Sequence, residues 1–303
     1  MMNLERKTNK FYSFWTIFIF CLFLIFYGHF LNQQKDNLLI GADVKINNLP
    51  VDISAVSYLV GEINSGKLLA KKNSDLHLFP ASLSKLMAAV IVSENFSLDE
   101  EIVISPYAIS VEGEEGGLVV NEKIKAGDLL KILLISSSND AAIAFEEALE
   151  KKNGNFVGLM NQKAREFELF NSAFFDASGL DRKGNFTSIE DLFKLSQKIY
   201  KNYSYIGEIT RKKEDIIYSV DKETVHNLKN TNILVGEISN LWGGKTGSTP
   251  EAKDCLLTIY EFYFSDKSDK IVVAIIVLNS SDRFGDTVRL YDWVKEQLIM
   301  NKV

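Results

Sequence analysis

Residues 80–91 read Pro-Ala-Ser-Leu-Ser-Lys-Leu-Met-Ala-Ala-Val-Ile, a stretch that combines a helix pattern with two reactive side chains. Apolar side chains recur three and four residues apart from position 83 onward, which predicts a helix over 82–95 packed against a core. Pro80 and Ser82 are typical of a helix start. Since Ser82 and Lys85 are three residues apart, we expect them to share one face of the first turn.

This spacing has a chemical meaning only if the lysine is neutral. A serine hydroxyl becomes a strong nucleophile when a neighbouring base takes its proton, and a charged ammonium cannot do so. Burial beside Leu86 and Met87, or a second nearby cation, would lower the pKa of Lys85. Taken alone, the Ser-x-x-Lys pattern more often describes a capping serine followed by a solvated lysine.

A second polar segment, Ser136-Ser-Ser-Asn-Asp140, separates the apolar run 129–135 from a helical pattern over 141–149. Such a segment is ordinarily a turn whose side chains cap helix amides. The functional alternative puts Ser137 and Asn139 in one cleft. There the hydroxyl could relay a proton and the amide could hold a substrate amide.

A third segment, Trp242-Gly-Gly-Lys-Thr-Gly-Ser-Thr-Pro250, contains Gly-Lys-Thr and so raises the question of a phosphate loop. That loop requires a glycine at position 239, where the chain has serine, and a helix to follow. We therefore reject nucleotide binding. Glycines that flank Lys245 and Thr246 on a strand would let a ligand backbone approach closely. The Lys245 ammonium and the Thr246 hydroxyl could then bind a carboxylate. A plain turn before a strand is, however, the simpler interpretation.

The remaining pattern predicts strands at both ends of the domain and helices between them. Segments 58–63 and 67–71 form a predicted hairpin with Gly66 in its turn. A second antiparallel pair is expected at 255–263 and 271–278, joined by the polar turn 265–270. Helical spacing is found at 82–95, 127–135, 139–150, 155–168, 188–201 and 286–299. This order predicts an α+β fold, an antiparallel sheet flanked by helices plus a helical subdomain.

The composition excludes several classes of protein. The 303 residues are 46% hydrophobic and 24% charged, which is typical of a globular chain. A net charge of −6 argues against a nucleic-acid partner. The three histidines and two cysteines share no metal-ligand spacing, so we expect no metal and no cofactor.

The N-terminal region differs from the rest of the chain. Residues 11–31 carry no formal charge and are long enough to cross a bilayer as a helix. Because Arg6, Lys7 and Lys10 precede them, we expect residues 1–10 in the cytoplasm, an anchor at 11–31, a tether at 32–49 and an extracytoplasmic domain at 50–303. This makes the chain a single-pass protein of the cell membrane. A cleaved signal peptide is the alternative.

Together, and in this order, the three segments resemble the motif set of the serine-type penicillin-recognising enzymes. The chain is most similar to the D-alanyl-D-alanine carboxypeptidases, the low-molecular-mass penicillin-binding proteins, from about residue 54 to 296. The segments 156–161 and 176–181 also look like family stretches, whereas Lys253-Asp254 stands where small residues are more usual. The resemblance implies a β-lactamase/transpeptidase-like fold.

The resemblance also implies roles for individual residues. Ser82 would be the nucleophile, Lys85 its base and Ser137 the proton relay. Asn139, Lys245, Thr246, Gly247 and Ser248 would bind substrate, and the backbone amides of Ser82 and Ser248 would form the oxyanion hole. The implied partners are a peptidoglycan stem peptide and β-lactam inhibitors, with no cofactor.

Several alternatives remain open at this point. A β-lactamase would need a carboxylate to activate water, and the segment Arg165–Asn171 has a superficial likeness to such a loop but fits better as a helix end. A membrane-tethered scaffold that binds penicillin without turnover is a second alternative. A zinc peptidase lacks ligands, and a Ser-His-Asp hydrolase lacks a Gly-x-Ser-x-Gly turn.

Overall fold

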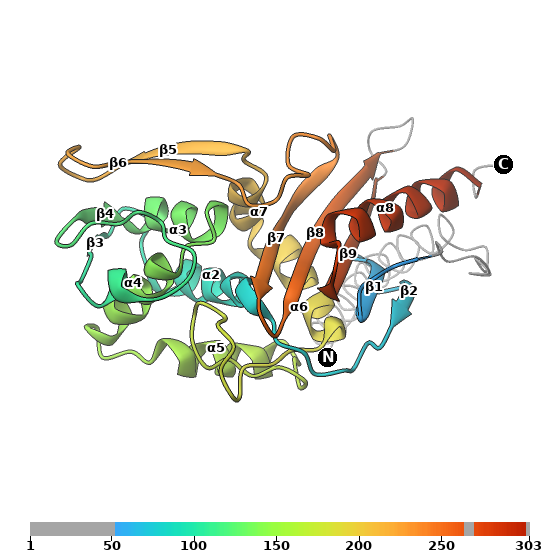
Figure 1. The fold of residues 1–303 in the computed structure, drawn as a ribbon, viewed down its shortest axis with the longest axis horizontal. Coiled ribbons are helices and arrows are strands. Elements are labelled where there is room, and N and C mark those ends of the chain that lie inside the picture. The colour runs from blue at the N-terminus through green and yellow to red at the C-terminus, as the bar shows by residue number, and fades with distance from the viewer. Residues whose placement is uncertain (1–51, 264–269, 301–303) are drawn as a thin grey trace, which may run out of the picture. The chain divides into compact units, whose positions relative to one another are not determined.

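Figure 1 shows a computed structural model of the chain, which describes residues 52–263 and 270–300. The predicted anchor at 11–31, the tether and most of the turn at 265–270 lie outside these residues. Residues 48–296 form one compact unit, to which the following description applies. None of the helices within the described ranges is long and apolar enough to cross a membrane.

A five-stranded antiparallel sheet joins the two ends of the catalytic region. Its strand order is β2-β1-β9-β8-β7, so β1 near the start pairs directly with β9 near the end. The strands are β1 (Ser57–Glu62), β2 (Leu68–Lys72), β7 (Leu241–Thr249), β8 (Lys253–Tyr263) and β9 (Lys270–Ser280). The predicted antiparallel sheet and both predicted strand pairs are confirmed.

Helices cover both faces of this sheet, which explains why β9 is apolar along nearly its whole length. Helix α6 (Ile189–Asn202) packs against β9 and β1 on one face. Helix α8 (Arg283–Met300) lies across the other face, where the Tyr291 ring meets Tyr260 of β8 at a centroid distance of 4.8 Å (Figure 1).

The helical subdomain is built around α2 (Ser84–Asn95), whose residues 84–92 are all buried. The short 3-10 turn η1 (Ala81–Leu83) leads into it. Its neighbours are α3 (Ala126–Ile135), α4 (Asn139–Glu150) and α5 (Phe156–Glu166). The predicted helices therefore exist within about two residues of the expected ends, a scatter usual for helix termini.

Some short elements are absent from the sequence-based prediction. They are η2 (Ala108–Ser110), α7 (Ser204–Thr210) and two small hairpins, β3 (Glu101–Val103) with β4 (Lys123–Lys125) and β5 (Glu214–Tyr218) with β6 (Val225–Lys229). Apart from α7, each of these elements buries only one or two of its residues. The periodic spacing of apolar residues by which a sequence reveals a helix or strand is therefore weak in them. The Lys-Thr-Gly segment itself lies inside strand β7, rather than in a turn ahead of a strand.

Candidate active site

Ser82 lies in the η1 turn immediately before α2. The preceding Ala81 has a φ of +48°, a left-handed conformation that is unusual for a residue with a side chain. Such strain is held by the surrounding fold and is found most often at functional sites. From this turn Ser82 Oγ lies 3.0 Å from Lys85 Nζ, so the structure brings the two predicted residues together.

Lys85 is completely buried, and its amine has three oxygen neighbours. Nζ lies 2.7 Å from Asn139 Oδ1 and 2.7 Å from the backbone oxygen of Ser178, both of which can only accept. The third neighbour, Ser82 Oγ, can also donate. A neutral amine with its two hydrogens on the two acceptors therefore directs its lone pair at the Ser82 hydroxyl.

The electrostatic environment favours this neutral form. Burial lowers the pKa of Lys85 to about 7, although the carboxylates of Asp176, Glu114 and Asp140 act in the opposite direction. A pKa near 7 is well matched to a general base at neutral pH.

Ser137 and Lys245 form a second close pair. Ser137, between α3 and α4, has a φ of +64°, and its Oγ accepts a 2.7 Å hydrogen bond from Lys245 Nζ. The same amine contacts the backbone oxygen of Thr246 at 3.0 Å. Burial, followed by the nearby charge of Lys85, lowers the pKa of Lys245 well below its usual value. The hydroxyl of Thr246 is hydrogen-bonded to that of Thr231 at 2.5 Å.

The side chain of Asn139 is engaged on both sides. Its Oδ1 accepts from Lys85, and its Nδ2 donates to the backbone oxygen of Glu112 at 2.8 Å. One of the two Nδ2 hydrogens is left for a ligand. The structure thus shows Asn139 holding the Lys85 amine, while the substrate contact that the sequence suggested stays a prediction.

Strand β7 runs directly beside the η1 turn. A Cβ atom added to Gly247 would lie 3.0 Å from Ser82 N, so glycine permits this close approach. Arg283, at the start of α8, donates to the backbone oxygen of Gly247 at 2.9 Å and to Asp254 Oδ1 at 3.1 Å. Arg283 belongs to no recognisable sequence motif. Its contact with strand β7 is visible only in the folded structure.

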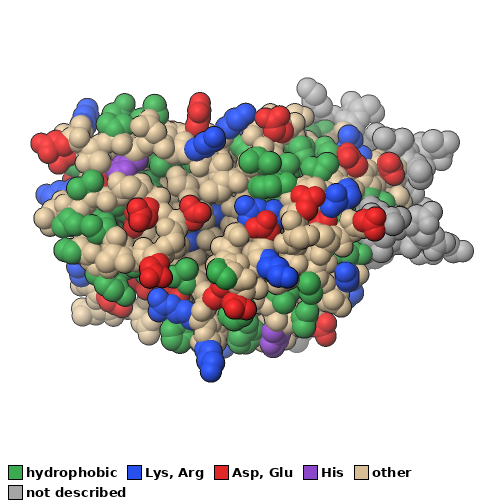
Figure 2. Space-filling view, viewed as in Figure 1, with side chains coloured by type: hydrophobic (Ala, Val, Ile, Leu, Met, Phe, Trp, Pro, Cys, Tyr) green, Lys and Arg blue, Asp and Glu red, His purple; other side chains and the backbone are tan. Residues whose placement is uncertain are grey.

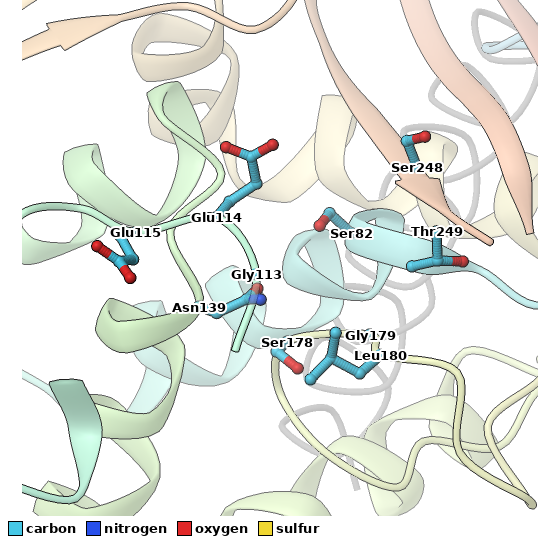
Figure 3. Close-up of a pocket in the computed structure, with 10 residues that line it drawn as sticks. All are labelled: Ser82, Gly113, Glu114, Glu115, Asn139, Ser178, Gly179, Leu180, Ser248 and Thr249. Atoms are coloured by element: carbon cyan, nitrogen blue, oxygen red, sulfur yellow. The ribbon is translucent and has the colours of Figure 1, made fainter. Parts of the chain in front are cut away.

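Figure 3 shows the cavity into which these elements converge. It has a volume of about 400 Å³ and is lined by Ser82, Gly113, Glu114, Glu115, Asn139, Ser178, Gly179, Leu180, Ser248 and Thr249. Lys85, Lys245 and Ser137 are buried and are not among its lining residues. On the face drawn in Figure 2, acidic side chains are interspersed with basic ones.

The remaining polar candidates lie elsewhere. Glu166, at the end of α5, pairs with Lys163 at 2.7 Å and does not line the cavity. His226 is buried against Glu122, with Nε2 2.6 Å from Oε1. Cys255 is buried, which raises its pKa to about 12. Across residues 52–263 and 270–300, no three His, Cys, Asp or Glu side chains are grouped to hold a metal ion.

The sequence is similar to bacterial proteins that are named D-alanyl-D-alanine carboxypeptidases. D-alanyl-D-alanine carboxypeptidase DacF of Bacillus subtilis is 33% identical over 208 residues, which cover 67% of this chain and 53% of that protein. DacC of Escherichia coli is 25% identical over 254 residues, which cover 80% of this chain and 61% of that protein. The chain thus spans only about half to three fifths of these two relatives.

The fold is shared with a solved structure of similar size. The DD-transpeptidase of Streptomyces K15 superimposes with a TM-score of 0.73 at 27% identity, covering 81% of this chain and 98% of the other. A family model described as D-alanyl-D-alanine carboxypeptidase matches residues 43–281. On this evidence the chain belongs to the D-alanyl-D-alanine carboxypeptidase family, peptidase family S11.

Proposed function

We propose that the chain is a serine D-alanyl-D-alanine carboxypeptidase that removes the last D-alanine from peptidoglycan stem peptides. One observation carries the proposal: the amine of a buried lysine lies 3.0 Å from Ser82 Oγ and 2.7 Å from two oxygens that can only accept. In its neutral form this amine would direct its lone pair at Ser82. Family membership supplies the substrate class.

The reaction proceeds through an acyl-serine. Ser82 Oγ attacks the carbonyl carbon between the two D-alanines while Lys85 takes the hydroxyl proton. The C–N bond then breaks, and Ser137, hydrogen-bonded to Lys245, passes the proton that Lys85 took up to the leaving amine, which leaves Lys85 neutral again. Water hydrolyses the ester, which restores Ser82. The backbone amides of Ser82 and Ser248 would stabilise the oxyanion, each worth about 3–4 kcal/mol in the transition state.

Lys245 and Thr246 would bind the free carboxylate of the terminal D-alanine. An anion beside Lys245 favours its ammonium form and so opposes the lowering of its pKa by burial. Carboxylate binding and protonation of Lys245 are therefore coupled. Ser248 of β7 lines the cavity, and Gly247 precedes it on the same strand, so we expect both to contact the substrate backbone. A β-lactam carboxylate would use the same site, so that β-lactams act as inhibitors.

We place the enzyme on the outer face of the cell membrane, anchored through residues 11–31. The uncharged run and the preceding Arg6, Lys7 and Lys10 support this proposal. The full chain should sediment with membranes, and a chain lacking residues 1–37 should be released. A mature protein whose mass shows loss of the N-terminal segment would support signal cleavage instead.

The deciding experiment labels residues 50–303 with a fluorescent penicillin and follows release of D-alanine from a peptide ending in D-Ala-D-Ala. We expect one adduct on the peptide containing Ser82, lost in Ser82→Ala together with D-alanine release. An adduct that persists in Ser82→Ala would refute the assignment of the nucleophile. Rapid penicillin hydrolysis would indicate a β-lactamase, and a stable adduct without D-alanine release would indicate a scaffold.

A further inference from the structure

One buried carboxylate holds the turn from Asp176 to Gly179. Asp176 is 4% exposed, and its Oδ1 accepts hydrogen bonds from Ser178 N at 2.9 Å, Ser178 Oγ at 2.7 Å and Gly179 N at 2.7 Å. The turn ends at Gly179 in the left-handed region, with a φ of +87°, where a Cβ would overlap the carbonyl group of Ala81. The carboxylate therefore fixes backbone that packs directly on the residue before Ser82.

This turn supplies one of the acceptors of the Lys85 amine. The backbone oxygen of Ser178 lies 2.7 Å from Lys85 Nζ. Together with Asn139 Oδ1 it would accept both hydrogens of a neutral amine, so that the nitrogen lone pair would face Ser82. If the Ser178 carbonyl rotated away, a neutral amine would be free to turn its lone pair elsewhere. The direction of the base therefore depends on the conformation that Asp176 maintains.

We propose that Asp176 is a positioning residue for acylation of Ser82, because it holds the Ser178 carbonyl against Lys85 and faces the amine with a negative charge. The inference rests on the proposed role of Lys85 as the base. Asp176 makes no hydrogen bond to Ser82 or Lys85 and acts through the turn. Burial has the largest effect on the pKa of Lys85 and lowers it. Among the carboxylates that raise this pKa, Asp176 has the largest effect.

The charges around this network determine what a substitution should do. Lys85 is faced by Asp176 from the turn, Glu114 from the loop before β4, Asp140 from α4 and Lys245 from β7.

Asp176 itself has two ionisable neighbours, Arg182 and Glu146, and Glu146 titrates within the pH range of the test because burial raises its pKa to about 7. Its Oδ2 is buried without a hydrogen bond and lies 3.2 Å from Nε of Arg182, whose side chain is half exposed. Glu146 of α4 lies alongside and accepts a 2.5 Å hydrogen bond from Ala177 N. Arg182 therefore offsets part of the charge of Asp176 from an accessible position.

The test measures the rate of penicillin acylation of residues 50–303 between pH 5 and 9. The rate should fall on acidification as Lys85 becomes protonated. Asp176→Asn keeps an acceptor for the turn but removes the charge, so the ammonium form of Lys85 is less favoured. Its acid limb should shift to lower pH by about 0.5–1 unit. Arg182→Gln removes the opposing cation and should shift the limb to higher pH by a smaller amount.

A matched control separates this effect from lost stability. Asp286 is an equally buried carboxylate that accepts from Ser54 N, Ala55 N and Ser280 Oγ and pairs with Arg289, away from the cavity. Asp286→Asn should lower the melting temperature without moving the acid limb.

Opposite shifts in the two variants support the proposal. An acid limb that stays in place in both, moves the same way in both, or moves equally in Asp286→Asn overturns it. If Asp176→Asn fails to fold, the test rests on Arg182→Gln. An acid limb at the same pH in Arg182→Gln as in the unsubstituted chain would then refute the proposal. Absence of any adduct in the unsubstituted chain would instead refute the proposed function.

Discussion

Replacing Gly179 with alanine should destabilise the domain far more than the same change at Gly117. Both glycines are left-handed, with φ of +87° and +70°. A Cβ at Gly179 would lie 2.6 Å from the carbonyl carbon of Ala81 and closer still to its oxygen, whereas a Cβ at Gly117 meets no atom within 4 Å. The pair therefore separates backbone strain from steric overlap.

The magnitude follows from these two terms. Left-handed backbone costs an alanine about 1–2 kcal/mol at either position. Overlap with backbone adds about 1–3 kcal/mol at Gly179 alone, because neither segment can move without disturbing the buried η1 turn. The difference between the variants should thus be about 1–3 kcal/mol. For a domain of this size that corresponds to about 2–12 °C in Tm.

Urea denaturation of both variants, with the unsubstituted domain as reference, measures this difference directly. Gly179→Ala should also acylate more slowly, since displacing the turn moves the Ser178 oxygen away from Lys85 Nζ. If the two variants unfold with free energies within about 0.5 kcal/mol of each other, a magnitude typical of an unaffected surface site, the tight contact between the turn and η1 is refuted.

Three further predictions concern buried groups. Lys85→Met should slow penicillin acylation by about 100-fold or more, the usual contribution of a general base, while the folded domain persists by circular dichroism; a rate close to that of the unsubstituted enzyme would refute the assignment. Burial, followed in effect by Asp176, raises the pKa of Glu146 to about 7, so its stabilising contribution is complete below about pH 4.5 and is lost as pH rises through about 7. Glu146→Gln should therefore raise Tm more at pH 8 than at pH 5, and the opposite order would contradict this. Cys255, whose pKa burial raises to about 12, should resist thiol reagents in the folded domain 50–303 and react fully in urea; rapid reaction without urea would contradict its burial.

Much of the fold follows from local pattern. The alternation and β-branched content of 58–63, 255–263 and 271–278 predicted strands, and apolar spacing predicted α2 through α6, because those residues meet a core. The small hairpin β5–β6 escaped prediction since it keeps one face in solvent, with Ile216 and Tyr218 exposed. The predicted domain boundaries and the anchor at 11–31 stay predictions.

The chemistry of the site was also visible in part. The residue types and spacings of Ser82, Lys85, Ser137, Asn139 and Lys245 made them candidates, and the resemblance to the D-alanyl-D-alanine carboxypeptidases implied their roles, which stay predictions. Asp176 could have been singled out only by its place two residues before Ser178 and three before Gly179, the pattern of a side chain that caps its own turn. No such local pattern marks Arg283 or Glu114.

By itself, then, the amino-acid order determined which side chains were available and where most of the long helices and strands would lie, because helix and strand periodicity are local properties. It did not place Lys245 and Thr246 inside strand β7. Only the tertiary structure decided which of these side chains lie next to one another. Strand β1 pairs with β9 more than 200 residues away, and β7 lies against the η1 turn at Gly247. The lowered pKa of Lys85 depends on burial by distant segments, since the loss of water around an amine is a property of the packed interior.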